Sequence, residues 1–441
     1  MSAEPVPTEA VEYAERFAAF VEASPSSFHA VEAMAQALAA AGFMEHRETE
    51  DWPALRDGSA GFVRRDGALI AWLAGEGVSA TSPVRVLGCH TDSPGFVLKP
   101  QPDFTAEGWA QAGVEVYGGP LLNSWLDRDL AFAGRIVSRT GSEHLVRTGP
   151  VARIPQLAIH LDREANSALK LDRQRHLQPI IGAAGAAPAG LEPSALGLLA
   201  AAAGIERDEI AGADVRLADT QPPARIGVAG ELLASPRLDN LSSVFAGLTA
   251  LLEASDPGTG GVASGTVAML AAFDHEELGS ETRSGASGPF LADVLGRLGR
   301  GLGATGDDTA RALAASWCLS ADAGHAVHPN YPERHDPRVR PRPGGGPMLK
   351  VNANQRYASD AHGAALWQRV CAAAGVPTQE FVSNNEVPCG TTIGPLTATR
   401  IGIRTVDVGV PLLSMHSARE LAHVSDLHGL SLAVASFFAG A

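Results

Sequence analysis

The sequence predicts an α/β fold that carries a second, mainly β-stranded domain, and three observations lead to this prediction. Strand-like and helix-like patterns alternate near the start of the chain and again over its C-terminal half. Several strand-like runs end in acidic and histidine side chains, which is typical of the ligand-binding edge of an open α/β sheet. Between about Phe96 and Glu231 glycine, proline and short β-prone runs replace this alternation. Because 441 residues exceed the size at which one hydrophobic core keeps growing, we expect two domains.

The first predicted elements are two helices and a hairpin. Residues 8–42 place apolar side chains at helical spacing, with a break at SPSS and a stop at Gly42. Residues 61–72 have the pattern of a hairpin that turns at Asp66 and Gly67. An apolar strand follows from Val84 to Gly88.

The middle of the chain predicts an inserted, largely β domain. Its β-prone runs are VEVYGGPL, FAGRIVSR and ARIPQLAIHL, and an Ala-, Gly- and Pro-rich passage extends from Ile181 to Gly204. His160 stands at the end of one of these runs, and its immediate surroundings favour a structural role.

The α/β pattern resumes after this region. The predicted elements are a helix from Leu241, a strand from Val267 to Phe273, a helix over 289–299, a strand from Trp317 to Leu319, a helix over 361–375, a strand from Ile403 to Val408 and a closing helix from Asp426.

An acidic cluster follows the strand from Val267 to Phe273. Asp274, His275, Glu276 and Glu277 come directly after this apolar run. Adjacent carboxylates repel one another, and a protein tolerates this most readily when a cation lies between them or when one of them titrates. A solvated acidic turn is the alternative, and the local sequence does not decide between the two.

Other strand ends and loops carry similar side chains. His90 and Asp92 follow a strand, so the imidazole can face a metal while the carboxylate is a ligand or orients the ring; a histidine paired with a backbone carbonyl is the alternative. Asp239 stands near a helix start, where its local pattern favours a helix N-cap. Asp322 follows a third strand, and His416 lies in a loop after a fourth.

Taken together, these side chains predict a metal site. A set of nitrogen and oxygen donors without cysteine suits zinc, manganese or cobalt better than calcium or an iron–sulfur cluster. Five such ligands are too many for one tetrahedral ion, and they suit two ions that share one bridging carboxylate.

Composition narrows the class of protein further. A formal net charge of −15 argues against nucleic acid or an anionic membrane as partner. The four scattered cysteines predict free thiols, and no apolar run approaches the length of a bilayer span. The N-terminus carries acids where a secretory signal needs a basic start, so we expect a cytoplasmic protein.

Seven long segments appear in the order found in one peptidase family: GCHTDSPG, IPQLAIHL, SPRLDN, FDHEELGS, SADAGHAVHPNY, MLKVNANQRYASD and MHSARE. They resemble the M18 aspartyl aminopeptidases, and the resemblance covers essentially the whole chain. It implies a zinc-peptidase-like mixed sheet flanked by helices, with an inserted, mainly β dimerisation domain. The implied boundaries are a catalytic domain at 1–95 and 232–441 and the inserted domain at 96–231. The implied assembly is a dodecamer built from dimers.

The resemblance also implies roles for individual residues. One metal ion is held by His90, Asp239 and Asp322, and the other by Asp239, Glu277 and His416, so that Asp239 bridges them. Both ions are expected to be zinc, for which manganese or cobalt can substitute. Glu276 is the implied general base, and Asp92 is the implied carboxylate behind the first histidine. The implied substrate contacts are His160, His325, Lys350 and Tyr357. His160 is alternatively a metal ligand, and in this family it reaches the active site of a neighbouring subunit.

The implied activity is removal of the N-terminal residue from peptides that have a free α-amine. Lys350 predicts a preference for Asp or Glu at that position through a charge-assisted hydrogen bond; a surface lysine beside a flexible loop is the alternative. The same metals would also serve a deacylase or a carboxypeptidase, so the substrate pocket decides which bond is hydrolysed. A shell-forming assembly protein with a vestigial site is disfavoured because every expected ligand is present.

Overall fold

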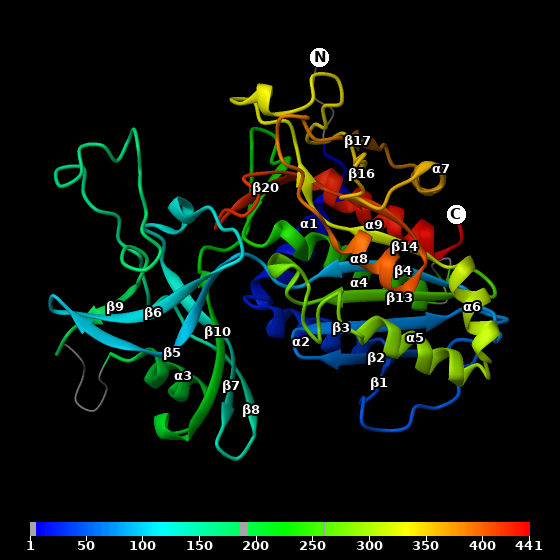
Figure 1. Cartoon of the computed structure of the whole chain (residues 1–441), viewed down its shortest axis with the longest axis horizontal. Helices are drawn as coiled ribbons and strands as arrows, with labels where there is room; N and C mark the ends of the chain where they lie inside the picture. The colour runs from blue at the N-terminus through cyan, green and yellow to red at the C-terminus, as the bar shows by residue number, and fades with distance from the viewer. Residues whose placement is uncertain (1–5, 186–192, 257, 259–260) are drawn as a thin grey trace.

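The computed structural model describes residues 6–185, 193–256, 258 and 261–441, and it places an α/β part beside a β-rich part (Figure 1). Residues 1–5 and 186–192, the latter from the Ala-, Gly- and Pro-rich passage, lie outside the described residues. The sheet of the α/β part has the spatial order β1 (Met44–Glu45), β2 (Ala60–Arg65), β3 (Ala68–Ala74), β13 (Val267–Phe273), β4 (Val84–His90), β14 (Trp317–Ala321), β18 (Arg404–Gly409), β16 (Met348–Lys350) and β17 (Gln379–Phe381).

The centre of this sheet is parallel. β13, β4, β14 and β18 run in the same direction, whereas β3 and β16 pair antiparallel to them on either side. The register pairs Phe273 with His90, so β13 and β4 end at the same level. All seven residues of β13 are buried, as expected of a strand covered on both faces.

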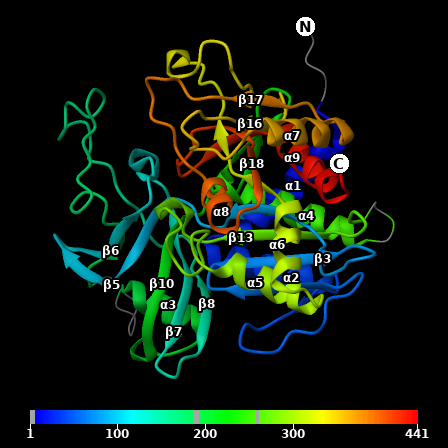
Figure 2. The ribbon, with the colours of Figure 1, turned by 45° about the vertical axis from the view of Figure 1, so that its right-hand side comes forward.

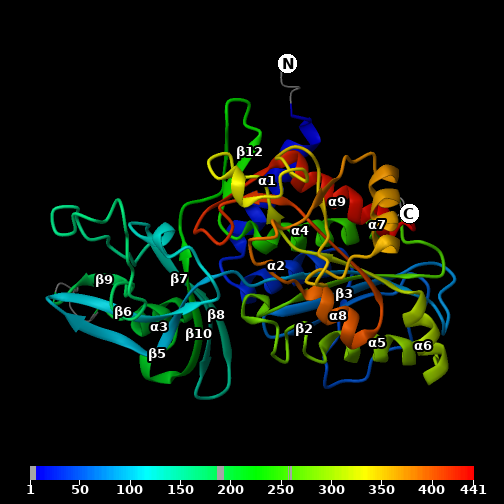
Figure 3. The same cartoon turned by 45° about the horizontal axis from the view of Figure 1, so that its top comes forward.

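Helices cover both faces of the sheet (Figures 1 and 3). One core contains side chains from α1 (Thr8–Ala23), α2 (Ser27–Ala40), α4 (Leu238–Ser255), α7 (Ala361–Ala373) and α9 (Val424–Phe438). The opposite core contains α5 (Phe290–Gly301) and α8 (Ile393–Ile401), with α6 (Gly306–Ala315) at its edge. Alternate side chains of β13 enter the two cores: Leu270 faces the first and Met269 the second. The predicted mixed sheet flanked by helices is therefore confirmed.

The predicted elements of the α/β part are present with shifted ends. β2 and β3 form the predicted hairpin, and β13 has the predicted bounds. The strand predicted to end at Gly88 continues to His90, because Cys89 and His90 pair with Ala272 and Phe273.

The β-rich part is an antiparallel sheet with its own core (Figure 2). Its order is β8 (Glu143–Arg147), β7 (Leu130–Ser138), β10 (Ile210–Asp219), β5 (Gly95–Ala106), β6 (Trp109–Tyr117) and β9 (Ile180–Ala183), and α3 (Ala195–Ala203) packs on it. The β-prone run ARIPQLAIHL is strand-like only at its start. Its first three residues, Ala152, Arg153 and Ile154, form isolated β-bridges, while Leu157 and Leu161 are exposed.

A third sheet packs on the core of the α/β part through residues such as Leu233, Leu412 and Ala422, and the sequence did not predict it because its strands are short. Its order is β11 (Ala224–Ile226), β12 (Leu232–Ser235), β20 (Glu420–His423), β19 (Pro411–Leu413) and β15 (Gly324–His325). Short 3₁₀ turns occur at η1 (Leu122–Trp125), η2 (Arg207–Glu209), η3 (Glu276–Leu278) and η4 (Pro332–Arg334). Within the described part of the chain, no helix is both long and apolar enough to cross a membrane.

Candidate metal centre

The carboxyl ends of β4 and β13 bring the first histidine and the acidic cluster together. His90 is the last residue of β4 and pairs with Phe273, the last residue of β13. Glu276 and Glu277 form the next turn, η3. Because neighbouring parallel strands end at one edge, residues far apart in sequence meet there.

Asp239 lies between two histidines. Its Oδ1 is 3.3 Å from His90 Nε2, and its Oδ2 is 3.5 Å from His416 Nε2. Asp239 and Asn240 have non-helical backbone angles within α4, and the helix has no side-chain cap at this end. The N-cap interpretation of Asp239 is therefore wrong.

Two further carboxylates complete the arrangement. Asp322 Oδ1 lies 3.4 Å from His90 Nε2, and Glu277 Oε1 lies 3.5 Å from His416 Nε2. Potential ligand atoms of His90, Asp239 and Glu277 all lie within 4.8 Å of one another. The five predicted ligand side chains thus form two groups that share Asp239.

The donor set and its unsatisfied atoms fit a metal ion. Asp239 Oδ1 and Glu277 Oε1 are buried and have no hydrogen-bond partner among the described residues. Buried carboxylate oxygens are nearly always hydrogen-bonded, so unpaired ones require an explanation. Imidazole nitrogens and carboxylate oxygens are common zinc ligands.

Both imidazoles are oriented through their Nδ1 atoms. His90 Nδ1 lies 3.0 Å from the backbone oxygen of Asp92 and 3.4 Å from its carboxylate Oδ1. His416 Nδ1 lies 3.0 Å from the backbone oxygen of Gly119. Each ring therefore presents Nε2 to the carboxylates. The backbone carbonyl partner considered for His90 exists, and it is compatible with ligand binding through Nε2.

The protein chain alone creates strong electrostatic coupling here. Burial disfavours charge on His416, but its contact with Asp239 and the charge of Glu277 outweigh this and raise its pKa to about 10. Burial raises the pKa of Glu276 to about 8, and nearby carboxylates add to this rise. The carboxylates around these two groups therefore favour a positive charge at the site, which a metal cation can supply.

Four of the five predicted ligands, Asp239, Glu277, Asp322 and His416, line a pocket of about 570 Å³. The predicted substrate-contacting residues His325, Lys350 and Tyr357 also line this pocket. Lys350 is 1% exposed, and its ammonium donates to Ala323 O at 2.7 Å and to Asp322 Oδ2 at 3.2 Å. The alternative of a surface lysine is therefore wrong.

His160 is placed differently from the other predicted residues. It lies on an exposed segment of the β-rich part and is not among the residues that line this pocket in the described chain. A single chain therefore does not bring it to the other site residues.

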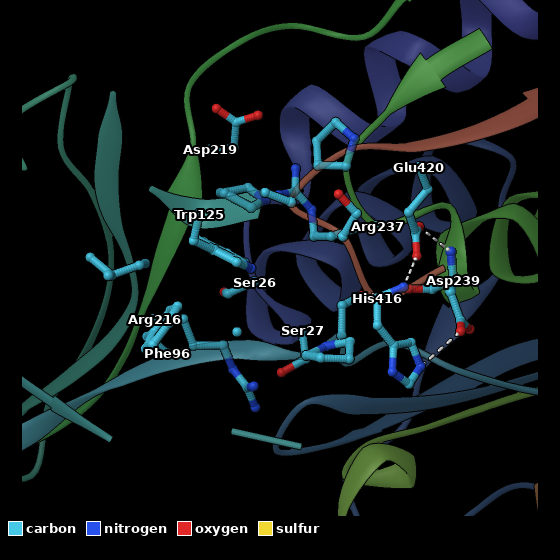
Figure 4. A pocket seen from close by; sticks show the side chains of 18 of the residues that line it. Ser26, Ser27, Phe96, Trp125, Arg216, Asp219, Arg237, Asp239, His416 and Glu420 are labelled. Atoms are coloured by element: carbon cyan, nitrogen blue, oxygen red, sulfur yellow. Dashed lines mark hydrogen bonds and ion pairs between the residues drawn. The ribbon is translucent and has the colours of Figure 1, made fainter. Parts of the chain in front are cut away.

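Two residues near the centre were not predicted from the sequence. Glu420 accepts the backbone N–H groups of Asp239 and His416, as Figure 4 shows. Tyr117 donates its O–H to Asp92 Oδ2 at 2.8 Å. Neither lies in a pattern that distinguishes it from ordinary strand or loop residues, although Glu420 ends the segment MHSARE.

Comparison with known proteins gives consistent results. The model of the family described as aminopeptidase I zinc metalloprotease (M18) matches residues 20–438. The probable M18 family aminopeptidase 2 of Streptomyces coelicolor is 50% identical over 420 residues, which is 95% of each chain.

Solved structures show the same similarity. A chain in the cryo-EM structure of the Ape4 and Nbr1 complex is 35% identical with a TM-score of 0.93, covering 99% of this chain and 88% of that one. The mApe1 dodecamer of S. cerevisiae is 29% identical with a TM-score of 0.84, covering 98% and 97%. The chain belongs to the M18 family of zinc metalloaminopeptidases.

Proposed function

We propose that this chain is a dinuclear zinc aminopeptidase that removes N-terminal residues from peptides and prefers Asp or Glu at that position. The observation that carries the proposal is the position of Asp239, whose two carboxylate oxygens face His90 and His416 separately. One carboxylate between two histidines supports a pair of ions with a shared ligand.

The proposed ligands are the five side chains already described. His90, Asp239 and Asp322 hold one ion, and Asp239, Glu277 and His416 hold the other. Manganese or cobalt can replace zinc, because the nitrogen and oxygen donors suit all three. Bound zinc would act as a Lewis acid that polarises the peptide carbonyl and lowers the pKa of the attacking water.

Glu276 is the proposed general base. It lines the pocket beside the proposed ligands, and its carboxylate would accept a proton from the attacking water and return it to the leaving amine. Asp92 orients this region because its carboxylate accepts the N–H groups of Glu276 at 3.0 Å and Glu277 at 3.2 Å. Glu276→Gln should remove nearly all hydrolysis while the zinc content stays unchanged.

Lys350 is the proposed source of the acidic preference. A buried ammonium in a pocket wall favours a carboxylate side chain by about 1.5–3 kcal/mol, or roughly 10- to 150-fold. The ring of Tyr357 lies 5.3 Å from the Lys350 ammonium, and His325 lines the same pocket.

Unblocked Asp- and Leu-arylamides test the proposal. Wild type should cleave the Asp substrate faster and should not cleave its N-acetyl form. Lys350→Met should reduce the Asp-to-Leu ratio, whereas Lys99→Met, a half-buried control on β5 that does not line the pocket, should not. An unchanged ratio in Lys350→Met would remove the specificity claim, and cleavage of the N-acetyl substrate would remove the aminopeptidase claim.

We further propose that the chain forms homo-oligomers, built as a dodecamer from dimers, through an inserted domain at residues 96–231. Residues 1–95 and 232–441 would form the catalytic domain. The exposed Leu157 and Leu161 beside His160 support a contact with another subunit. The dodecameric state of the related mApe1 supports the same assembly.

In this assembly His160 would act at the substrate of a neighbouring subunit rather than as a metal ligand. A mixing experiment tests this. His160→Ala and Glu276→Gln should each be inactive alone. If His160 acts between subunits, co-assembly of the two variants should restore activity, because some sites then contain both native residues. Persistent inactivity of the mixed assembly would contradict this role.

A further inference from the structure

We propose that residues 117–124, which run from the last residue of strand β6 into η1, are a positioning segment for both metal-site histidines, so that the inserted sheet sets the metal affinity of the catalytic part. This inference rests on the proposed ligand assignment of His90 and His416. It concerns residues that are not themselves ligands, and its consequences are measurable without peptide hydrolysis.

Tyr117 makes the contact at one end of the segment. It is the last residue of β6, and its side chain is 7% exposed. Its O–H donates to Asp92 Oδ2 at 2.8 Å, the shortest of the three hydrogen bonds found to that carboxylate. A hydroxyl bonded to a buried carboxylate restrains its position because the charged acceptor strengthens the bond.

Asp92 transmits this restraint to the metal site. It contacts His90 Nδ1 through its backbone oxygen at 3.0 Å and through Oδ1 at 3.4 Å. The same carboxylate accepts the N–H groups of Glu276 and Glu277. A shift of Asp92 would therefore move the His90 ring and the acidic turn together.

The other end of the segment holds His416. The backbone oxygen of Gly119 lies 3.0 Å from His416 Nδ1, and Leu121 N–H donates to His416 O at 2.9 Å. Ser124 Oγ accepts the N–H of Ala418 at 2.8 Å. The segment thus contacts the ring and the backbone of this proposed ligand.

The loop that carries His416 needs such support. Ser414 and His416 have φ angles of 58° and 65°, in the left-handed region that non-glycine residues rarely adopt. Such conformations persist where surrounding contacts determine them. The hydrogen bond that Leu121 N–H donates to His416 and the one that Ser124 Oγ accepts from Ala418 are contacts of this kind.

The segment is itself fixed by the inserted sheet. The guanidinium of Arg216, on β10, lies 3.7 Å from the centre of the Tyr117 ring, which is a close cation–π contact. Arg216 and Trp125 of the inserted part and His416 and Asp239 of the catalytic part line one cavity of about 30 Å³ (Figure 4). The position of both histidines therefore depends on packing within the sheet that lies outside the catalytic part.

Zinc affinity in Tyr117→Phe tests the inference. Loss of a direct hydrogen-bond partner of a metal ligand typically weakens metal binding 10- to 100-fold, and Tyr117 acts one bond further out, through Asp92. We expect a zinc dissociation constant about 10-fold higher, at the lower end of this range, measured by competition with a fluorescent chelator. The matched control is Tyr13→Phe, which removes a hydroxyl from a buried tyrosine packed on Phe245 and should leave the constant unchanged. Unfolding of the chelated proteins checks that both variants fold.

Ser124→Ala tests the His416 end independently. It should weaken binding of one zinc ion selectively, giving a biphasic titration, because Ser124 contacts the loop of His416 and not that of His90. His90→Ala and His416→Ala test the ligand assignment and should lose zinc. If they do, and Tyr117→Phe and Ser124→Ala both bind zinc as tightly as wild type, the inference is overturned. If the two histidine variants also bind zinc normally, the ligand assignment fails, and the inference fails with it.

Discussion

The carboxylate of Glu420 accepts the backbone N–H of Asp239 at 2.9 Å. Its other oxygen accepts the N–H of His416 at 2.7 Å (Figure 4). Glu420 begins β20 of the third sheet, whereas Asp239 belongs to α4. One buried side chain therefore fixes the backbone of both Asp239 and His416.

Glu420→Ala should weaken zinc binding and destabilise the fold. It leaves two buried N–H groups without their acceptor, and each unsatisfied group costs about 1–3 kcal/mol. We expect zinc affinity to fall about 10- to 100-fold, as for other residues that support metal ligands. Glu420→Gln keeps one acceptor oxygen and should give an intermediate effect. Zinc competition and urea unfolding in chelator measure both quantities, and normal zinc affinity in Glu420→Ala would contradict this role.

Metal removal should lower thermal stability. Ions that bind the folded chain stabilise it by mass action, by about 2.7 kcal/mol when free zinc is 100 times the dissociation constant. Chelation also leaves the buried carboxylates of Asp239 and Glu277 without a cation. Thermal unfolding at fixed protein concentration should therefore show a lower Tm in chelator and recovery on adding zinc, manganese or cobalt. A His90→Ala/His416→Ala double variant is the control, and its Tm should not respond to zinc.

The strands of the α/β part were predictable to different degrees. β13 was predicted with the observed bounds because seven apolar residues stop abruptly at Asp274. The end of β4 was missed by two residues because pairing with β13 decides it. IPQLAIHL has strand-like residues, but most of them are exposed and outside any sheet. Strand propensity depends on the packing surface available, which the local sequence does not contain.

The sequence predicted the proposed ligands of the candidate site, but it did not predict the residues that support them through hydrogen bonds. Histidines and acids after strands indicated a metal centre, and the structure brings the five predicted ligands together. Glu420 and Tyr117 gave no comparable signal, because their contacts join segments that are far apart in sequence. Which backbone group a side chain reaches is set by tertiary packing.

Stability should depend on pH through Asp426, a buried residue at the start of α9. Burial raises its pKa from 3.8 to about 7, although it accepts N–H bonds from Gly344 and Gly346. The folded state then binds an extra proton between these pH values, so this stabilisation is full below pH 3.8 and is lost as pH rises through about 7.

Asp426→Asn isolates this effect. In wild type the free energy of unfolding should fall between pH 5 and pH 7 by up to about 1.4 kcal/mol per pH unit more than in the variant. Urea unfolding in chelator at both pH values measures the difference and keeps metal binding out of the comparison. Asp426→Asn can be less stable overall, since the amide loses one acceptor. Equal pH dependence in both proteins would contradict the prediction.

Alkylation of Cys389 should block the pocket. This thiol is half-buried and lines the pocket beside Tyr357 and Phe381, whereas the other three cysteines are buried. Iodoacetamide should therefore modify Cys389 first, and hydrolysis should fall in parallel because the added group occupies space that the substrate needs. Mass spectrometry and residual activity measure the two changes on the same samples. Cys389→Ser should remain active and resist the reagent, and free aspartate should slow modification of wild type. Complete alkylation with unchanged activity would show that substrate does not occupy this side of the pocket.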